Sequence, residues 1–480
     1  MRALQNKKLA RFIKTYVYPF SPRYRRTFDE NGIKPGSIRT VEDLQAIPFT
    51  SKLDLIATDG RTEKFKEYIL QPDKETIRKF WPATRLIRLA LSSALRGQEY
   101  VEDQMAREFR PAFMTFTTGT TNLPTAFLYS NHDVDNLHIY GARMLKLFDI
   151  AGSDRIVNMF PYAPHLAFWQ VVFGGLASSV LIMSTGGGKV MGTDGNISAL
   201  MKMKPAVLLG VPSYVYHVLR TARDQGRDLS FLKKIVLGAA RLGEGFKEKI
   251  TELLMQMGSG DVSVFGTYGF TEARCAWAEC PTSISVSSGY HLYPDKEIFE
   301  VIDPKTGVVR GEGEDGELVY TALDARGSVV LRYRTGDFVR GGITYAPCPH
   351  CRRTVPRVSS DITRLSDVKD MRLSKIKGAL VDLNNFSSVL SDIKMIDEWQ
   401  IELRKHNNDP FDVDEVVVYV SPKSGCDRAR LEEEVKKKIL LSTEVTPNRV
   451  DFLELPELVR RLELETASKE KRIIDNRPKG

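Results

Sequence analysis

A threonine-rich turn in the first third of the chain carries the donors that a phosphate chain needs. Residues 115–125 form a hydroxyl-rich, glycine-centred segment that contains Thr117, Thr118, Gly119, Thr120 and Thr121. Backbone N–H groups and threonine hydroxyls in such a turn can surround phosphate oxygens. The Gly-Lys-Ser/Thr signature of a Walker loop is absent. By itself the turn is equally compatible with an ordinary surface loop.

A second turn, after a strand predicted to end near residue 266, combines an aromatic ring with a carboxylate. It contains Tyr268, Gly269, Thr271 and Glu272. The tyrosine ring can stack on a base or on a bound acid. A carboxylate next to a phosphate loop can supply an oxygen ligand to Mg²⁺, which prefers oxygen and keeps several waters.

A third turn ends in Asp337, which we expect at the end of a β-strand. Its carboxylate could accept hydrogen bonds from both hydroxyls of a ribose. Each of the three turns is weak support alone, because tight turns with acidic residues are common. Their order and separation along one chain together favour a single nucleotide site.

The cysteines indicate a metal. Cys348 and Cys351 have the C-x-x-C spacing in a proline-rich turn, and Cys280 lies eleven positions before His291. Three thiolates and one imidazole can close a tetrahedral structural zinc site, which leaves no open position for catalysis. We predict zinc bound by these four residues, with Cys275 or His350 as substitutes for one of them. Buried inert thiols and a redox pair are the alternatives.

The elements that position these residues follow from hydrophobic patterning. Between residues 113 and 268, short apolar runs alternate with helix-period segments, which is typical of parallel strands buried on both faces. The strands are predicted at 155–160, 180–183, 206–210, 234–238 and 262–266. Sheets of this kind bind ligands at the carboxyl ends of their strands.

Beyond residue 290 the pattern changes to β-hairpins and then to a smaller unit. Hairpin strands are predicted at 297–302, 316–323 and 328–334. The smaller unit has predicted strands at 399–403, 413–420 and 450–455 and a helix at 431–439. The predicted fold class is α/β, with a large domain of layered parallel or mixed sheets and a β-rich subdomain over residues 1–365. A small α+β domain covers 366–480.

Composition excludes several classes of protein. The 480 residues include 69 Lys+Arg and 61 Asp+Glu, a net charge of +8, and 42% are hydrophobic. This balance excludes disordered, collagen-like and multi-span membrane chains. No basic arm predicts nucleic-acid binding, and neither a signal core nor a membrane span is present, so a cytoplasmic location is expected. The oligomeric state stays open, with a homodimer among the alternatives.

The basic, apolar stretch at 75–110 has two interpretations. An ordinary helix packed on the core, with its arginines in solvent, is favoured. A surface that lies on a membrane or covers a pocket is the alternative.

Residues 117–125, 268–272 and 333–337 resemble three motifs of the adenylate-forming superfamily of acyl/aryl-CoA ligases. These motifs are the phosphate loop, the aromatic-Gly-x-Thr-Glu motif and the ribose-binding Tyr-Arg-Thr-Gly-Asp motif. Segments 48–52, 302–304, 316–319 and 468–475 are similar to the phenylacetate–CoA ligase branch of that superfamily. The similarity covers most of the chain in the correct order.

The resemblance implies a two-step reaction. A carboxylate attacks the α-phosphate of ATP to give an acyl-adenylate and pyrophosphate, and the thiol of CoA then displaces AMP. The resemblance assigns the phosphates to the threonine turn, Mg²⁺ to Glu272, ribose to Asp337 and the adenylate to Tyr268. Gly238, Ala239 and Ala240 stand where the family has its adenine-contacting turn. Lys469 aligns with the lysine that bridges carboxylate and phosphate, and Lys471 is the alternative.

Several positions depart from the family pattern. The phosphate loop lacks the usual lysine, because Leu123 stands before Pro124. The hinge motif is degraded, with Asp367 or Asp370 as the pivot, whereas residues 374–378 fit the thioester-side loop. These departures keep a catalytically weakened nucleotide-binding homologue among the hypotheses.

The acid pocket is implied by an aromatic segment that resembles the family's substrate segment, with Tyr162, His165, Phe168 and the motif residue Tyr268 as candidate contacts. Such a pocket suits an aryl or arylacetic acid. His165 could equally be a core residue. The acceptor is expected to be CoA, and a carrier protein, a partner cysteine or a cofactor hydroxyl is the alternative. The implied cofactors are ATP, Mg²⁺, CoA and structural Zn²⁺.

Overall fold

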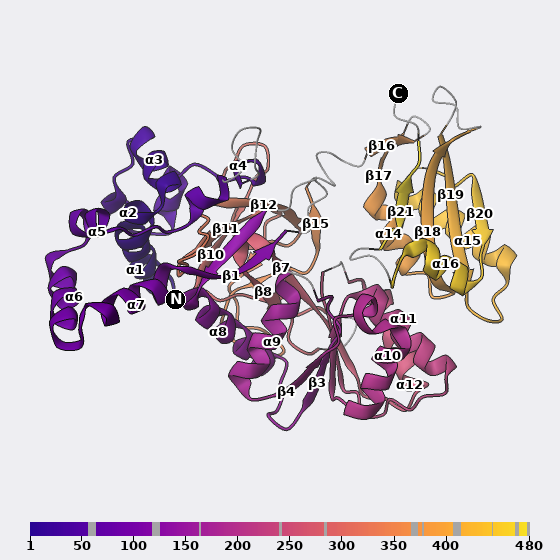
Figure 1. Cartoon of the computed structure of the whole chain (residues 1–480). Coiled ribbons are helices and arrows are strands. Elements are labelled where there is room, and N and C mark those ends of the chain that lie inside the picture. Colours follow the sequence, from indigo (N-terminus) through magenta and orange to yellow (C-terminus); the bar gives the residue numbers. More distant parts are fainter. Residues whose placement is uncertain are drawn as a thin grey trace.

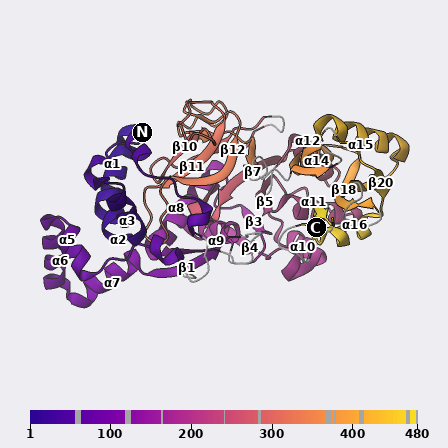
Figure 2. The same cartoon turned by 90° about the horizontal axis from the view of Figure 1, so that it is seen from above.

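The computed structural model describes residues 1–55, 64–117, 125–162, 165–239, 242–282, 286–365, 373–376, 379–406, 414–443, 445–465 and 470–477 (Figure 1). Several predicted residues lie outside these ranges, namely Thr118, Gly119, Thr120, Thr121, Ala240, Asp367, Asp370 and Lys469. Seen from above, the N-terminal helices and the C-terminal β-rich unit lie at opposite ends of the molecule (Figure 2).

A nine-stranded sheet with the order β13-β14-β9-β8-β7-β6-β5-β3-β4 forms the centre of the molecule. Its strands are β3 (Arg155–Asn158), β4 (Leu181–Ser184), β5 (Val207–Gly210), β6 (Lys234–Leu237), β7 (Ser263–Phe270), β8 (Cys275–Ala278), β9 (Tyr290–His291), β13 (Ile343–Thr344) and β14 (Arg357–Val358). The five predicted parallel strands are confirmed, because β4, β3, β5, β6 and β7 pair in parallel. Helix α8 (Asn131–Leu147) precedes β3, and the helices between the parallel strands are α9 (Leu166–Ser178), α10 (Gly188–Met203), α11 (Pro212–Asp224) and α12 (Glu244–Met255).

The first part of the second motif lies inside a strand, whereas Thr271 and Glu272 lie in the 3-10 turn that follows it. We expected β7 to end near residue 266, but it continues through Tyr268 and Gly269 to Phe270. The antiparallel neighbour β8 supplies the reason, since Tyr268 pairs with Trp277 and Phe270 with Cys275.

An antiparallel sheet with the order β10-β11-β12-β15 packs beside the central sheet. Its strands are β10 (Glu297–Ile302), β11 (Gly316–Ala322), β12 (Tyr333–Val339) and β15 (Ile362–Arg364). The prediction of a strand at 328–334 was wrong, because β12 begins only at Tyr333. The backbone of residues 328–330 forms hydrogen bonds with residues 68, 128 and 322 and is not part of that strand. Asp337 therefore lies inside β12, not at a strand-end turn.

Helices dominate the N-terminal part of the chain. They are α1 (Arg2–Phe12), α2 (Tyr18–Phe20), α3 (Pro22–Glu30), α4 (Lys52–Leu55), α5 (Lys74–Phe80), α6 (Ala83–Arg96) and α7 (Gln98–Phe109), followed by the hairpin β1 (Pro111–Phe116) and β2 (Ala126–Ser130). The basic stretch at 75–110 is thus helical, as predicted. Helix α6 buries none of its residues and exposes Ile87, Leu91 and Leu95.

The C-terminal part builds a separate sheet with the order β20-β19-β18-β21. Its elements are β16 (Leu373–Ile376), β17 (Ala379–Asp382), α14 (Leu383–Ser391), β18 (Ile396–Lys405), β19 (Asp414–Pro422), α15 (Arg428–Thr443), β20 (Arg449–Phe452), α16 (Leu455–Leu462) and β21 (Ile473–Asp475). The predicted strand at 450–455 is too long, because a proline at the second position of α16 starts a helix there. We call residues 373–477 the small unit and residues 1–365 the large unit.

Within the described part of the chain, no helix combines the length and the apolar character needed to cross a membrane.

Candidate functional site

Strands β7 and β12 interlock two of the motifs through their side chains. The Tyr268 hydroxyl donates to Asp337 Oδ2 at 2.7 Å, and the Tyr333 hydroxyl donates to Glu272 Oε1 at 2.8 Å. Both carboxylates are buried, with Asp337 4% and Glu272 9% exposed. Burial, reinforced by the charge of Asp337, raises the pKa of Tyr268 well above its usual range, so its hydroxyl stays a donor. The two motifs thus form one site.

An arginine that sequence reasoning missed completes this cluster. Arg364 in β15 lies opposite Asp337 in the strand register, and its Nε lies 3.0 Å from Asp337 Oδ1. Its Nη1 also donates to the carbonyl of Thr335 at 2.9 Å. Partial desolvation opposes the guanidinium charge, but the charge of Asp337 outweighs it and raises the pKa of Arg364, whose side chain is still 53% exposed. No motif marks this arginine in the sequence, because only the pairing of β12 with β15 brings it to Asp337.

The base of the threonine turn is closed by its own hairpin. Thr117 N–H donates to Thr125 O at 3.0 Å, and Thr125 N–H donates to Thr117 Oγ1 at 3.1 Å. Strand β2 is joined in turn to the segment before β12, since Leu128 and Ser328 exchange hydrogen bonds of 3.0 and 2.9 Å. The described ends of the turn are therefore connected to the chain that leads into the Asp337 strand.

Gly238 and Ala239 follow β6 at the carboxyl edge of the parallel strands. A Cβ atom at Gly238 would lie 2.3 Å from Thr267 Oγ1, so this close approach to β7 requires glycine. Ala239 has φ +68°, in the left-handed region. The predicted adenine turn therefore lies beside the strand that carries Tyr268.

The predicted acid-pocket residues belong to a cluster of aromatic rings around the start of α9. Phe168 is buried, whereas Tyr162 is 63% exposed, and their ring centroids lie 5.2 Å apart. Trp169 extends the cluster to Phe113 of β1 at 5.2 Å. His165 immediately precedes α9. The rings border the threonine hairpin, because Phe113 belongs to the strand that leads into it.

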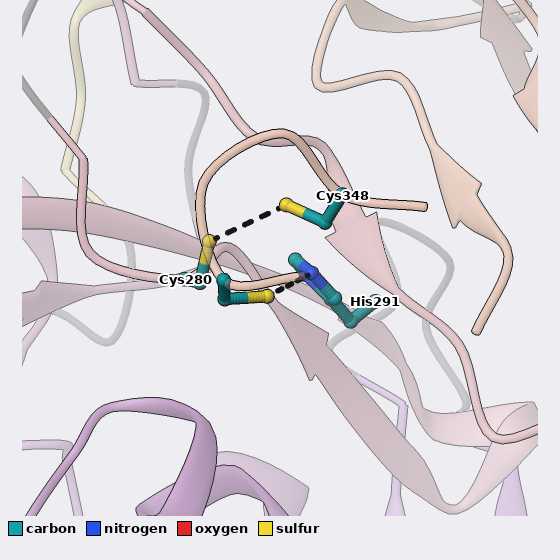
Figure 3. Close-up of side chains that lie close together, drawn as sticks. Cys280, His291 and Cys348 are labelled. Atoms are coloured by element: carbon teal, nitrogen blue, oxygen red, sulfur yellow. Dashed lines mark hydrogen bonds between the residues drawn. The ribbon is translucent and has the colours of Figure 1, made fainter. Parts of the chain in front are cut away.

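The four predicted metal ligands come together, and Figure 3 labels three of them, Cys280, His291 and Cys348. Ligand atoms of Cys280, His291, Cys348 and Cys351 all lie within 4.8 Å of one another. Cys280 Sγ and Cys348 Sγ are 3.8 Å apart, and Cys351 Sγ lies 3.2 Å from His291 Nε2. The alternative ligands Cys275 and His350 are not part of this group.

The donor set fits a tetrahedral metal. With Zn–S bonds of about 2.3 Å, two thiolates of a tetrahedron lie about 3.8 Å apart, the distance seen between Cys280 and Cys348. His291 Nδ1 donates to Ala278 O at 3.3 Å, which directs the lone pair of Nε2 to the cluster. Burial raises the pKa of Cys280 to about 12 and lowers that of His291 to about 4.

Comparison with known families identifies the class of protein. The family model described as AMP-binding enzyme matches residues 42–323, which is more than half of the chain. The chain belongs to the AMP-binding enzyme family, and its fold agrees with this assignment.

Two curated relatives are similar to this chain over most of its length. The phenylacetate-coenzyme A ligase of Thermus thermophilus is 28% identical over 88% of this chain and 82% of its own length. The phenylacetate-coenzyme A ligase of Aromatoleum evansii is 24% identical over 100% of this chain and 95% of its own length.

A solved structure shares the fold along almost the whole chain. A 2-hydroxyisobutyryl-CoA ligase in the postadenylation state matches with a TM-score of 0.74 and 20% identity, over 98% of this chain and 89% of that one. The same ligase in its thioesterification state gives 0.62 over 99% and 90%.

Proposed function

We propose that the protein is an ATP-dependent, AMP-forming acid–CoA ligase that acts on an aryl or arylacetic acid. The observation that carries this proposal is a cluster of hydrogen-bonded and ion-paired side chains on β7, β12, β15 and the short 3-10 turn Thr271–Ala273 that follows β7. Its members are Tyr268, Glu272, Tyr333, Asp337 and Arg364. It supplies buried, oriented carboxylates and hydroxyls next to a threonine hairpin. Membership of the AMP-binding enzyme family and the phenylacetate-coenzyme A ligase relatives support the same reaction.

Charge is the central problem of this chemistry, because a carboxylate and a triphosphate repel each other. The site must supply donors and cations that act most strongly when charge moves onto the leaving pyrophosphate. In this proposal Thr117, Thr118, Gly119, Thr120 and Thr121 surround the phosphates. Lys469 bridges the acid and the α-phosphate. Leu123 in place of the loop lysine removes one cation, so pyrophosphate departs more slowly than from a lysine-containing loop.

The carboxylates have separate roles. Asp337 accepts the ribose hydroxyls, and Arg364 and Tyr268 keep its carboxylate oriented. Glu272 supplies an oxygen ligand to Mg²⁺, which would neutralise phosphate charge, and the Tyr333 hydroxyl fixes its side chain. Gly238, Ala239 and Ala240 contact the adenine, and Gly269 and Thr271 shape the nucleotide turn.

The acid lies among Tyr162, His165, Phe168 and Tyr268. The aromatic cluster around α9 supports a planar or arylacetic substrate, since rings of this kind stack on and enclose an aromatic acid.

Residues 1–365 and 366–480 act as two domains with alternating roles. The small domain rotates between half-reactions, presenting Lys469 for adenylation and then residues 374–378 for attack by the CoA thiol.

Cys280, His291, Cys348 and Cys351 would hold zinc, which would tie the β8–β9 connection to the loop after β13. Its donor set supports a structural role because four protein ligands leave no open coordination position. The bound ion would fix the strand that pairs with the Tyr268 strand.

Formation of an acyl-adenylate tests the proposal. The protein is mixed with ATP, Mg²⁺ and a panel of carboxylic acids, and acyl-adenylate is detected by mass spectrometry. Adenylate with an aryl or arylacetic acid, followed by CoA-dependent release of AMP, is the expected result. Adenylate without CoA-dependent release supports another acceptor, and no adenylate with any acid contradicts the proposal.

A further inference from the structure

The small unit rests on α11 and α12 through buried polar groups, and both views place these helices beside it (Figures 1 and 2). Arg220 of α11 is 1% exposed, and its Nη1 lies 3.4 Å from Asp397 O and 3.7 Å from Glu398 Oε1. Lys249 of α12 is 4% exposed and donates to Ile396 O at 3.1 Å. Two buried cations of the large unit thus reach the first three residues of β18.

A bulge explains why β18 can offer these groups. Ile396 pairs with Pro422 and Glu398 with Ser421, so Asp397 is an extra residue in the ladder. A bulge takes a residue out of the ladder and turns its polar groups away from the sheet. Asp397 uses both its carbonyl, toward Arg220, and its carboxylate, which accepts from the Tyr216 hydroxyl at 3.3 Å.

Glu398 also holds a cation from the end of the chain. Its Oε2 lies 2.8 Å from Arg472 Nη1, and Glu398 itself is 2% exposed. Arg472 packs over the Trp399 ring at 4.8 Å and donates to Trp399 O at 3.1 Å. Arg472 stands three positions after Lys469. One buried carboxylate therefore links α11 of the large unit to the segment that follows the proposed catalytic lysine.

The segment before that lysine is also attached to the large unit. Glu465 Oε1 accepts a hydrogen bond from the Thr193 hydroxyl and lies 3.5 Å from His217 Nε2. At the rim, Lys394 pairs with Glu248 at 2.8 Å. Residues on both sides of 466–469 are thus held in this orientation, Glu465 by α10 and α11 and Arg472 by Glu398.

The character of this contact suits an interface that opens. Each hydrophobic cluster of the described residues lies wholly in the large unit or wholly in the small one. A polar interface can separate without exposing a large apolar surface. Glu398 and its two arginines nevertheless favour this one orientation of the small unit, because a buried charge that loses its partner is strongly unfavourable.

We infer that Glu398, held between Arg220 and Arg472, is a positioning residue that latches the small unit in the orientation used for adenylate formation. This inference rests on the proposed function. The latch favours the first half-reaction because it fixes the C-terminal segment against the large unit. It must break before the small unit rotates for thiol attack.

The kinetic test compares the two half-reactions in Glu398→Gln. Pyrophosphate release from ATP and acid is expected to fall about tenfold, a typical strength for such coupling. Thioester formation from preformed acyl-adenylate and CoA should change less than about twofold, because the latch is open in that step. Arg220→Met removes the same contact from the large unit and should give the same pattern, whereas Arg220→Lys should restore part of the first step.

Asp414→Asn is the matched control. Asp414 is also a buried carboxylate of the small unit with two cations, Lys405 at 3.0 Å and Arg477 at 3.7 Å, and Arg477 also belongs to the C-terminal segment. Both of these ion-pair partners belong to the small unit. The Asp414→Asn variant should leave the ratio of the two half-reaction rates unchanged. Equal losses of both half-reactions in Glu398→Gln, or no loss in either, would overturn the latch.

A distance measurement separates failure of the latch from failure of the proposed function. Dyes are attached through an unnatural amino acid at Leu176 of α9 and Leu441 of α15, which are 69% and 75% exposed. Energy transfer in the wild-type protein should show one dominant population, and Glu398→Gln should shift it, whereas Asp414→Asn should not. If the wild-type protein forms no adenylate, the proposed function fails and this shift still tests the latch. An unchanged distribution in Glu398→Gln contradicts it.

Discussion

At the scale of single residues, Asp337 is the group on which the nucleotide proposal depends most directly. Asp337→Asn keeps the shape of the side chain but removes its charge, and its amide can accept through only one oxygen. Hydrogen bonds to a charged group contribute about 1.5–3 kcal/mol, so KM for ATP should rise roughly 10–100-fold. Steady-state kinetics with varied ATP checks this.

Two variants make the Asp337 result interpretable. Tyr268→Phe removes one donor to Asp337 but keeps the carboxylate, so its effect on KM for ATP should be smaller. Asp361→Asn changes a more exposed carboxylate near the same strand and should have no effect. An unchanged KM for ATP in Asp337→Asn would remove the ribose assignment.

Glu297 predicts a pH dependence of stability. It is 1% exposed in β10, and its Oε1 accepts from Trp277 Nε1 at 2.5 Å and from Tyr293 N–H at 2.9 Å. Burial raises its pKa from 4.5 to about 8. Between these values the unfolded chain loses the proton before the folded protein does. This carboxyl therefore lowers the stability of the fold as pH rises from 4.5 to about 8.

Glu297→Gln keeps an acceptor for both donors but cannot ionise. Its stability relative to wild type should increase by about 1.4 kcal/mol for each pH unit across that window. Urea denaturation at pH 5 and pH 8 measures the difference. Glu300→Gln is the contrast, because it deprives Arg332 of its partner at 3.1 Å and should destabilise the protein at both pH values. A constant effect of Glu297→Gln at both pH values would contradict the raised pKa.

Site residues could be predicted from the sequence where residues close together in the chain form a recognisable spacing. Cys348 and Cys351 are three positions apart, and their spacing indicated a ligand pair that the structure brings next to Cys280 and His291. Arg364 was missed because its meaning depends on its strand partner, which is set by the register of β12 and β15.

At the scale of elements, the cysteine cluster should stabilise the connection from β8 and β9 to the loop after β13. Cys348→Ser removes one ligand of the proposed zinc site. With an unfolding entropy of about 2.1 cal/mol/K per residue, a loss of about 3 kcal/mol would lower the Tm of the large unit by roughly 4 °C. Differential scanning calorimetry and zinc content by mass spectrometry measure both effects.

Cys426→Ser is the matched control for the metal site. Cys426 is partly exposed in the small unit, outside the cluster, so its substitution should change neither Tm nor zinc content. Zinc-free wild-type protein with the same Tm as the zinc-loaded protein would rule out a structural metal.

Strands were predicted correctly where both faces of the strand are buried, because such strands consist of short runs of apolar residues. Strands β3, β5 and β6 are buried along most of their length, and their runs were recognisable without any partner. Strand β12 was misplaced because residues 329–331 are apolar and buried. Their backbone bonds to distant segments, including Tyr68, and periodicity does not reveal such pairings.

At the scale of the whole molecule, contacts between the units were the least predictable feature. Arg220 and Glu398 are distant in the sequence, and each alone is typical of a solvated helix or strand. Only the packing of α11 against the bulged start of β18 gives them a shared role.

The separate cores predict that the two units unfold as separate cooperative units. The small unit has its own buried cluster, which includes Phe386, Trp399 and Val418, and its described contacts with the large unit are polar. Local unfolding follows such boundaries when few apolar contacts cross them. Hydrogen exchange in increasing urea should therefore give one opening free energy for amides of β18 and β19 and a different one for β5 and β6.

Repeating the hydrogen-exchange experiment with ATP provides a second, independent test. A ligand stabilises the unit that binds it by RT ln(1 + [L]/Kd), which is about 2.7 kcal/mol at a hundredfold excess over Kd. Saturating ATP and Mg²⁺ should raise the opening free energy of β5 and β6, because Asp337 and Glu272 belong to the large unit. Amides of β18 and β19 should gain less, and only through the interface around Glu398. Equal protection of both sheets would mean that the units unfold together, which contradicts an interface able to open during the reaction.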